Sequence, residues 1–442
     1  MSPEQLAAVV MMGLLLVMVI CGVHLAFALF FLALIFGLIF QGQLIFVMSM
    51  LKIFGTMQSE ILIAVPLFVF MGTVLEKSEV AEGVYQSLYE LFGPVRGGLA
   101  FATVITCTVF ASCTGVIAAT VTTMTLLAVP SMLKRRYDKG LATGVVCAGG
   151  SLGILIPPSV MLVMYGPMAG LSVAQLFAAA LFPGLLLSGL YLLYIGLGSW
   201  LRPDLAPAIR EEERSVRGAR LWGQALLKMI PTVILILAVL GSIIGGVASP
   251  TEASGVGAFA ALLIAAAYRK LSYANLKDAA YTTLIVTSMV FFIIIGASVF
   301  NSVFLYLGGG ILIKSLLLAL PLGKWFVLFV MMFVLFLLGF FISWQGLLYV
   351  VVPIFLPVAA SLGFNPLWFG LLICLNLQMS FLTPPFAYAI FFVKGASPPE
   401  VRTWDIYRGV IPFVILQAAA VFLCIVFPEI ILWLPRVTLG AG

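Results

Sequence analysis

The sequence predicts an all-α polytopic membrane protein with about ten transmembrane helices, two re-entrant helical hairpins and an inverted-topology repeat. Hydrophobic residues make up 63% of the chain and charged residues 9%, whereas soluble domains contain about 45–50% and about 25%. Apolar stretches of about 20 residues, the length that crosses a bilayer, recur from end to end. Two of these stretches carry a double proline, Pro157-Pro158 and Pro384-Pro385, 227 residues apart.

A double proline ends an α-helix, because each ring removes a backbone donor and collides with the preceding turn. Within lipid the freed carbonyl groups are costly unless polar groups face them. In membrane proteins, a pair of broken helices at matching positions is the best sequence indication of a solute and ion site. The two double prolines therefore predict two copies of one structural unit that together hold such a site.

The first half of the chain is expected to contain N-terminal helices over 1–58 and then a first unit over 59–200. The apolar segment 97–132 is interrupted by the polar run Ser112 to Gly115, and each side of it is short for a full span. We therefore expect a re-entrant hairpin there. The other helices of this half are expected at 5–22, 24–41, 59–76, 140–166 (broken at Pro157-Pro158) and 172–200, with an amphipathic surface stretch at 79–93.

The second half is expected to repeat this arrangement over 279–442, after a cytoplasmic loop and linking helices over 201–278. Its hairpin, 324–360, is interrupted at Ser343 to Gly346. The spacing supports the repeat, because Thr114 lies 43 residues before Pro157 and Ser343 lies 41 before Pro384. The remaining elements are expected at 222–247, 251–268, 279–306, 308–320, 366–393 (broken at Pro384-Pro385) and 406–433.

Basic residues predict the orientation, because Lys and Arg concentrate in cytoplasmic segments. With the N-terminus outside, seventeen Lys and Arg residues fall inside and four fall outside, namely Lys52, Lys314, Lys324 and Arg436. Both termini are therefore expected outside. The first hairpin then enters from the cytoplasm and the second from the opposite side, so the two units are inverted.

The polar groups at the tips and breaks indicate a Na⁺ site. Few carboxylates lie deep in apolar segments, which disfavours a proton relay or a protease with paired aspartates. Hydroxyls, amides and freed carbonyls remain, and these hard oxygen ligands suit Na⁺ rather than a transition metal. The cation-binding residues are expected to be Ser112, Thr114, Gly149, Gly153, Pro157, Ser343, Gly346, Thr383 and Pro384.

The same breaks expose the N-termini of half-helices, whose positive dipole ends favour an anionic solute. The substrate-binding residues are expected to be Cys113, Gly115, Ser159, Gln345 and Ser380. The alternative is that the prolines only kink helices while Ser and Thr bond back to their own helix. His24, the single histidine, is interpreted as structural, and Glu252 as the N3 residue of a capping box begun by Ser249.

At these residues the chain resembles the large membrane subunit of tripartite ATP-independent periplasmic (TRAP) transporters. The matching stretches occur in family order and are Ala64–Gly72, Arg96–Ala100, Gly153–Ser159, Tyr165-Gly166, Leu181–Gly184, Pro250–Ala253 and Leu382–Pro385. The segment Phe392–Glu400 is similar to the subgroup often labelled mannitol/chloroaromatic. One departure is the first tip, which commonly reads Gly-Ser-Ser in the family and here reads Ser112 to Gly115.

The resemblance implies a permease of the bacterial inner membrane that moves a transport domain along a scaffold as an elevator, driven by Na⁺. A periplasmic binding protein delivers the solute, usually an organic acid, and a small four-helix membrane subunit, here expected as a separate chain, braces the scaffold. No catalytic residue, cofactor, other metal or nucleic-acid partner is expected. The alternatives are an inverted-repeat ion or carboxylate carrier that needs no binding protein, a channel, and a membrane-embedded enzyme.

Overall fold

The computed structural model describes residues 2–115, 117–208, 219–384 and 387–440, and the regular elements in these ranges are all helices. The helices of the first half are α1 (Pro3–Ile20), α2 (Leu25–Gln41), α3 (Leu44–Met57), η1 (Glu60–Ile63), α4 (Ala64–Lys77), α5 (Val80–Phe92), α6 (Gly98–Thr114), α7 (Ile117–Lys134), α8 (Lys139–Ser151), η2 (Leu152–Ile154), α9 (Val160–Ala169), α10 (Val173–Leu201) and η3 (Pro203–Leu205).

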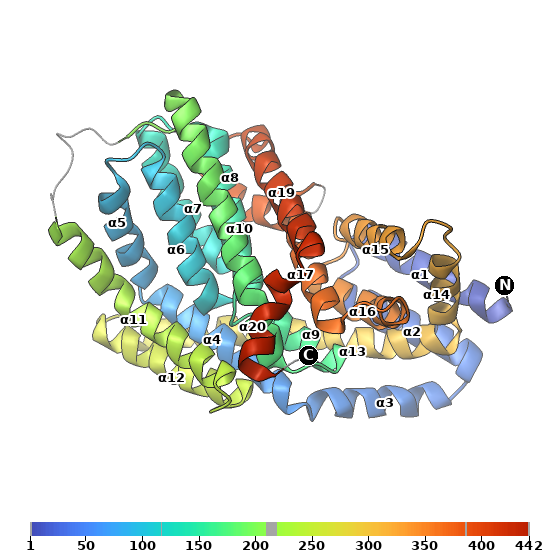
Figure 1. Cartoon of the computed structure of the whole chain (residues 1–442). Coiled ribbons are helices and arrows are strands. Elements are labelled where there is room, and N and C mark those ends of the chain that lie inside the picture. Colours follow the sequence, from blue (N-terminus) through green and yellow to red (C-terminus); the bar gives the residue numbers. More distant parts are fainter. Residues whose placement is uncertain (1, 116, 209–218, 385–386, 441–442) are drawn as a thin grey trace.

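The second half contains α11 (Ala219–Ile244), α12 (Pro250–Ala267), α13 (Tyr273–Tyr306), α14 (Gly309–Leu318), α15 (Lys324–Leu338), α16 (Trp344–Ser361), α17 (Pro366–Leu382), α18 (Tyr388–Ala396), α19 (Thr403–Val426) and α20 (Glu429–Leu439). In Figure 1, α13 runs along the lower part of the view with α3 beneath it, while α6, α7, α8 and α10 stand side by side. This is the all-helical architecture that the composition predicts.

Helix boundaries recur at the spacing of the two proline pairs. Helix α7 covers Ile117–Lys134 and α16 covers Trp344–Ser361, so both ends are shifted by 227 residues. Helix α8 begins at Lys139 and α17 at Pro366, again 227 residues later. The two halves therefore have the same element order in nearly the same register.

The recurrence extends beyond the expected boundaries of the two units. Helices α1 and α2 correspond in order to α11 and α12 at nearly the same spacing, since α2 begins at Leu25 and α12 at Pro250 (250 − 25 = 225). The segments 1–58 and 201–278 thus contain matching pairs of helices. We propose that each repeat unit includes its preceding pair, which widens the units beyond 59–200 and 279–442.

The two halves are related by reciprocal contacts. Helix α8 packs on α19 as its counterpart α17 packs on α10, and α7 packs on α18 as α16 packs on α9. At the centre, the Gln378 amide nitrogen donates to the Ser151 carbonyl oxygen at 3.0 Å, and these residues are 227 positions apart. Residues at equivalent positions can meet only near an axis of approximate two-fold symmetry, so such an axis passes here.

The α8–α19 contact depends on glycine. A Cβ built on Gly409 would lie 2.0 Å from the Gly140 carbonyl oxygen, and one on Gly144 would lie 2.3 Å from the Gly409 carbonyl oxygen. The two backbones therefore touch directly. Small residues that allow such close approach are typical of helix pairs in membranes, where dispersion contacts replace a hydrophobic driving force.

Three elements differ from the sequence expectation. Residues 44–57, expected as a connection, form α3, which meets the Glu60–Lys77 segment at a bend of 57°. Its counterpart in the second half is the straight beginning of α13, a helix of 34 residues rather than the expected 28. The last expected span, 406–433, ends at Val426, and α20 follows as a separate helix after Pro428.

Eight helices in the described ranges are long and apolar enough to cross a membrane, or nine if the bent α3–α4 pair counts as one span. Two of the eight, α7 and α16, are arms of the expected hairpins. Shorter apolar helices, among them α2 and α17, complete the set. The protein is therefore a polytopic all-α membrane protein, with several broken or short helices that simple length criteria do not count.

Candidate functional site

The first helix break follows Ser151, where α8 ends and η2 begins. After η2 the chain is irregular through Pro157 and Ser159 until α9 begins at Val160. The Ser159 hydroxyl donates to the Ile154 carbonyl oxygen, so one freed carbonyl is satisfied within the break. All residues from 151 to 160 are buried. The break is thus a buried, carbonyl-rich segment, as the double proline predicts.

The first hairpin tip packs against this break. Gly115 takes the left-handed conformation at φ 58°, where glycine is favoured, and a Cβ built on it would lie 3.6 Å from the Pro158 carbonyl oxygen. Gly153 faces Ala111 of α6 in the same way, with a Cβ-to-Cα separation of 3.6 Å. Tip and break of the first unit therefore lie together.

Two expected ligands of this unit have other contacts. The Ser112 hydroxyl donates to the Thr108 carbonyl oxygen at 3.2 Å, one turn earlier in α6. A Cβ built on Gly149 would lie 2.9 Å from the Cys107 Cβ, which makes Gly149 a packing residue between α8 and α6. The side chains of Cys113 and Thr114, expected at the substrate and cation sites, lie outside the described residues.

The second hairpin tip lies earlier in the chain than expected. Helix α15 ends at Leu338 and α16 begins at Trp344, so the break is at 339–343 and Gln345 and Gly346 belong to the first turn of α16. Ser343 is the N-cap residue, and its hydroxyl oxygen is buried with no hydrogen-bond partner among the described residues. A Cβ on Gly346 would lie 1.9 Å from Leu25 Cδ2, so Gly346 lets α16 approach α2.

The second break repeats the back-bonding of the first unit. Thr383, the C-cap of α17, donates its hydroxyl to the Met379 carbonyl oxygen at 2.7 Å, and Ser380 donates to the Leu377 carbonyl oxygen at 2.6 Å. A Cβ built on Gly339 would lie 2.4 Å from the Ser380 hydroxyl oxygen, so the second tip packs on α17. Pro384, the residue after Thr383, is exposed.

A cavity of about 540 Å³ opens beside the second tip. Its lining combines the tip, the second break, α13 and the turn between α1 and α2, with Ser343, Gln345, Phe381, Tyr388, Met289 and His24 among its residues. Three helices begin on this cavity, because Leu25, Trp344 and Tyr388 are the first residues of α2, α16 and α18. The first turn of a helix presents unpaired N–H groups and a positive dipole end, which favour an anion.

The sequence reasoning missed two residues of this cavity. His24, which the sequence indicates is structural, is the N-cap residue of α2, makes no capping bond with its side chain and also lines the cavity. Tyr388 begins α18 on the opposite wall. The available signals were a single histidine between two apolar spans and an aromatic hydroxyl just after a double proline. None of the site residues expected in the first unit is among the described residues that line this cavity.

A buried polar cluster joins the two units behind the breaks. The Gln378 amide nitrogen donates to the Ser151 carbonyl oxygen at 3.0 Å, and that of Gln417 donates to the Tyr191 hydroxyl at 2.9 Å. Because α8 ends at Ser151, its carbonyl group lies where the helix ladder stops. The cluster therefore satisfies a carbonyl that the first break frees, using a side chain from the second unit.

A second, smaller cavity of about 270 Å³ lies between α4, α7 and α13, next to the first tip. Glu76, Lys77, Thr73 and Thr122 line it. The neighbouring Thr123 hydroxyl donates to the Glu76 carboxylate at 3.3 Å, which joins α7 to the end of α4. Each hairpin thus lies against the end of a helix that is neither a hairpin arm nor a broken helix: α2 for the second hairpin and α4 for the first.

Comparison with known proteins gives consistent results. Residues 9–430 match the family described as "Tripartite ATP-independent periplasmic transporter, DctM component". The chain is 30% identical over 392 residues to a C4-dicarboxylate TRAP transporter large permease protein of Pseudomonas aeruginosa, covering 87% of this chain and 88% of that protein. It is 31% identical over 376 residues to an ectoine/5-hydroxyectoine TRAP transporter large permease protein of Ruegeria pomeroyi, covering 84% and 85%.

Two solved structures share the fold. The YdaH transporter of Alcanivorax borkumensis aligns with a TM-score of 0.62 at 16% identity, covering 96% of this chain and 98% of that one. MtrF of Neisseria gonorrhoeae aligns with a TM-score of 0.59 at 13% identity, covering 90% and 85%. The mannitol/chloroaromatic subgroup is named by none of these relatives and stays a prediction. From the family match over nearly its whole length, this chain belongs to the TRAP transporter DctM family and is a large permease subunit of the bacterial inner membrane.

Proposed function

We propose that this protein carries out Na⁺-coupled secondary uptake of a small anionic organic solute by an elevator mechanism, with the solute delivered by a periplasmic binding protein. The observation that carries the proposal is the cavity beside the second tip, where three helices begin and the buried Ser343 hydroxyl oxygen has no partner in the described part of the chain. A carboxylate placed there would accept hydrogen bonds from free N–H groups at the helix starts. His24, Gln345 and Tyr388 would supply further polar contacts.

The hydroxyl groups at the tips and breaks support cation binding even though they bond back to their own helices. The hydroxyl groups of Ser112 and Thr383 each donate a hydrogen bond to a carbonyl oxygen one turn earlier. A hydroxyl group that donates a hydrogen bond keeps two oxygen lone pairs, which can face a cation. Together with the carbonyl groups that the breaks free, these oxygens form the hard ligand set that Na⁺ prefers. The Na⁺ ligands proposed here are Ser112, Thr114, Gly153, Pro157, Ser343, Thr383 and Pro384, with carbonyl oxygens as the donors at glycine and proline.

The elevator proposal rests on which surfaces the hairpins contact. The second tip adjoins the α1–α2 turn at His24, and the first hairpin adjoins the end of α4 at Glu76 and Lys77. With the orientation expected from the charge distribution, both of these segments lie on the cytoplasmic side. Both tips therefore lie toward the cytoplasm, which corresponds to a cytoplasm-open state of a carrier whose hairpins and broken helices move together.

The partners are proposed from the family. Family members act as one component of a tripartite system, and a relative named isethionate TRAP transporter permease protein of Oleidesulfovibrio alaskensis is longer, so this chain covers 58% of it. We propose a separate small membrane subunit and a periplasmic binding protein as partners of this chain. The solutes named for relatives include C4-dicarboxylate, ectoine, isethionate and sialic acid, so the same permease fold serves different solutes.

The test is uptake by proteoliposomes that contain the permease and its small subunit, with the purified binding protein and radiolabelled candidate acids outside. We expect uptake with an inward Na⁺ gradient and no ATP, and its loss when K⁺ replaces Na⁺ or when the binding protein is omitted. Undiminished uptake in K⁺ would contradict Na⁺ coupling. Uptake without the binding protein would instead support the alternative, an ion or carboxylate carrier that works alone.

A further inference from the structure

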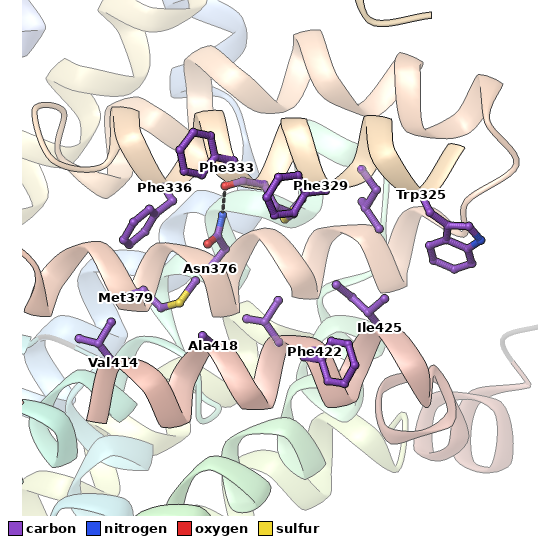
Figure 2. A pocket seen from close by; sticks show the side chains of 13 residues that line it. Trp325, Phe329, Phe333, Phe336, Asn376, Met379, Val414, Ala418, Phe422 and Ile425 are labelled. Atoms are coloured by element: carbon purple, nitrogen blue, oxygen red, sulfur yellow. Dashed lines mark hydrogen bonds between the residues drawn. The ribbon is translucent and has the colours of Figure 1, made fainter. Parts of the chain in front are cut away.

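An apolar groove of about 610 Å³ lies between α15, α17 and α19, away from the proposed solute cavity. Figure 2 shows its long axis, with Trp325 and Ile425 at one end and Phe336 and Val414 at the other. The one amide in its lining, Asn376, donates to the Met332 carbonyl oxygen at 2.6 Å. A space with this lining offers water few hydrogen-bond partners.

The equivalent helices of the first unit, α6 and α10, are in contact where the structure describes them. There α6 and α10 pack directly: a Cβ built on Gly196 would lie 3.4 Å from the Phe101 ring, and the Thr108 and Ser188 hydroxyls are 2.7 Å apart. By the 227-residue spacing, Phe101 corresponds to Leu328, which lines the groove. In the second unit α15 and α19 stand apart, so atoms from outside the chain must fill the space between them.

The dimensions of the groove match one leaflet of a bilayer. From Trp325 to Phe336 the helix advances about 16 Å at 1.5 Å per residue, and half of a hydrocarbon core of about 30 Å is about 15 Å. An extended hydrocarbon chain of one lipid therefore matches the length of the groove.

Aromatic and basic side chains mark the end of the groove that meets the headgroups. The Lys324 ammonium lies 5.5 Å from the Trp325 ring centre and 5.6 Å from that of Phe364, and Trp368 packs against both rings. Tryptophan concentrates at the headgroup level of membranes. Within the described ranges Lys324 forms no ion pair, so its charge is available to a phosphate.

We propose that this groove binds one acyl chain of an anionic phospholipid, whose phosphate group contacts Lys324. The lipid completes the packing between α15 and α19, which the first unit achieves with its own side chains. Because α15 is one arm of the second hairpin, the bound lipid supports that hairpin, whose tip contains Ser343.

The test is native mass spectrometry of the delipidated permease in a non-ionic detergent, with phosphatidylglycerol or phosphatidylcholine added. We expect one tightly retained phosphatidylglycerol per chain. Ala418→Trp, which fills the groove from α19, should remove it, while Ile415→Trp, at an exposed position on the same helix outside the lining, should not. Lys324→Gln should weaken retention of phosphatidylglycerol about fivefold and leave phosphatidylcholine unchanged.

Lys324→Gln changes an exposed side chain and leaves the helix packing intact, so it tests the headgroup contact even if Ala418→Trp fails to fold. Retention of phosphatidylglycerol by folded Ala418→Trp would overturn the proposal, as would equal retention of the two lipids by the wild type. Displacement of the lipid by the purified small membrane subunit would also overturn it and assign the groove to that protein.

Discussion

At the residue scale, the expected ligands fall into two kinds. Ser343 lines the cavity, and its buried hydroxyl oxygen has no hydrogen-bond partner among the described residues. Ser112, Ser380 and Thr383 donate to carbonyl groups of their own helices, and Gly149 and Gly346 make room for neighbouring side chains. Sequence alone cannot separate these roles, because a hydroxyl beside a helix break satisfies either one.

The first prediction concerns the hydroxyls of Ser112 and Thr383. If their oxygens coordinate Na⁺, removal of one ligand worth about 1.4 kcal/mol raises the half-saturating Na⁺ concentration about tenfold. Ser112→Ala and Thr383→Ala should show this shift in the Na⁺ dependence of uptake, with expression close to wild type. Thr143→Ala is the matched control, since Thr143 makes the same back-bond to Lys139 at 2.7 Å near the start of α8, far along the helix from the break. Unshifted Na⁺ dependence in both variants would assign these hydroxyls to packing.

At the element scale, the double prolines located both helix breaks correctly, but the tips shifted by up to four residues. Helix α6 continues through Ser112 to Thr114, and α16 begins at Trp344, so polar residues expected in the gaps belong to helix ends. Proline has a fixed steric effect at its own position. A Ser or Gln side chain has none, and tertiary packing decides whether it ends a helix.

The second prediction concerns the contact between α8 and α19. In Gly409→Ala the new methyl group would meet the Gly140 carbonyl oxygen at 2.0 Å, and the backbone must move to relieve it. Overpacking of this kind costs about 1–3 kcal/mol, so the thermal unfolding midpoint in detergent should fall. Gly189→Ala in α10, with nothing within 4 Å of its Cβ, should leave the midpoint unchanged or raise it. Equal midpoints for the two variants would mean that α8 and α19 are not in backbone contact.

At the scale of the whole molecule, the approximate two-fold relation places the halves around a shared buried cluster that includes Ser151, Gln378 and Gln417. The hairpins and broken helices contact one another, while each hairpin also contacts helices outside this group. In an elevator mechanism the contacts among the hairpins and broken helices persist throughout the transport cycle. The contacts between the hairpins and the helices outside this group must break in each cycle. This difference can be tested with pairs of cysteines.

The third prediction compares two such pairs. The Glu76 carboxylate and the Thr123 hydroxyl join α4 to the first hairpin at 3.3 Å. Because Cys is shorter than Glu, a short reducible bis-methanethiosulfonate cross-link between Glu76→Cys and Thr123→Cys is the suitable bridge, and it should stop transport until a reductant is added. Thr108 and Ser188 are 2.7 Å apart on α6 and α10. Because α10 packs on both the first hairpin and the broken helix α17, we count it with the moving group, and a disulfide between cysteines at these two positions should leave transport active. Full transport by the cross-linked first pair would contradict a displacement between α4 and α7.

The fourth prediction is the orientation. In a background in which all six native cysteines are replaced, Lys134→Cys should be labelled only from the cytoplasmic side and Arg436→Cys only from the periplasmic side. The reason is the excess of Lys and Arg in the segments expected inside. An impermeant maleimide applied to intact spheroplasts measures this directly, and outside labelling at residue 134 would reverse the model.

The sequence by itself determined the all-helical membrane architecture, the two breaks and the spacing of the repeat. Hydrophobic length and proline stereochemistry are local properties, and each can be read from consecutive residues. It did not determine α3, which is a separate helix in the first unit. The equivalent residues of the second unit form the beginning of the continuous helix α13.

Tertiary structure alone decided which polar residues meet. It brought His24 from the α1–α2 turn to the second tip, more than 300 residues along the chain, and placed Gln378 on the carbonyl that the first break frees. It also separated α15 from α19 while α6 and α10 stay packed, which created the apolar groove. The physical reason is that such contacts depend on how whole helices cross, and a crossing is set by the packing of many side chains together rather than by any one segment.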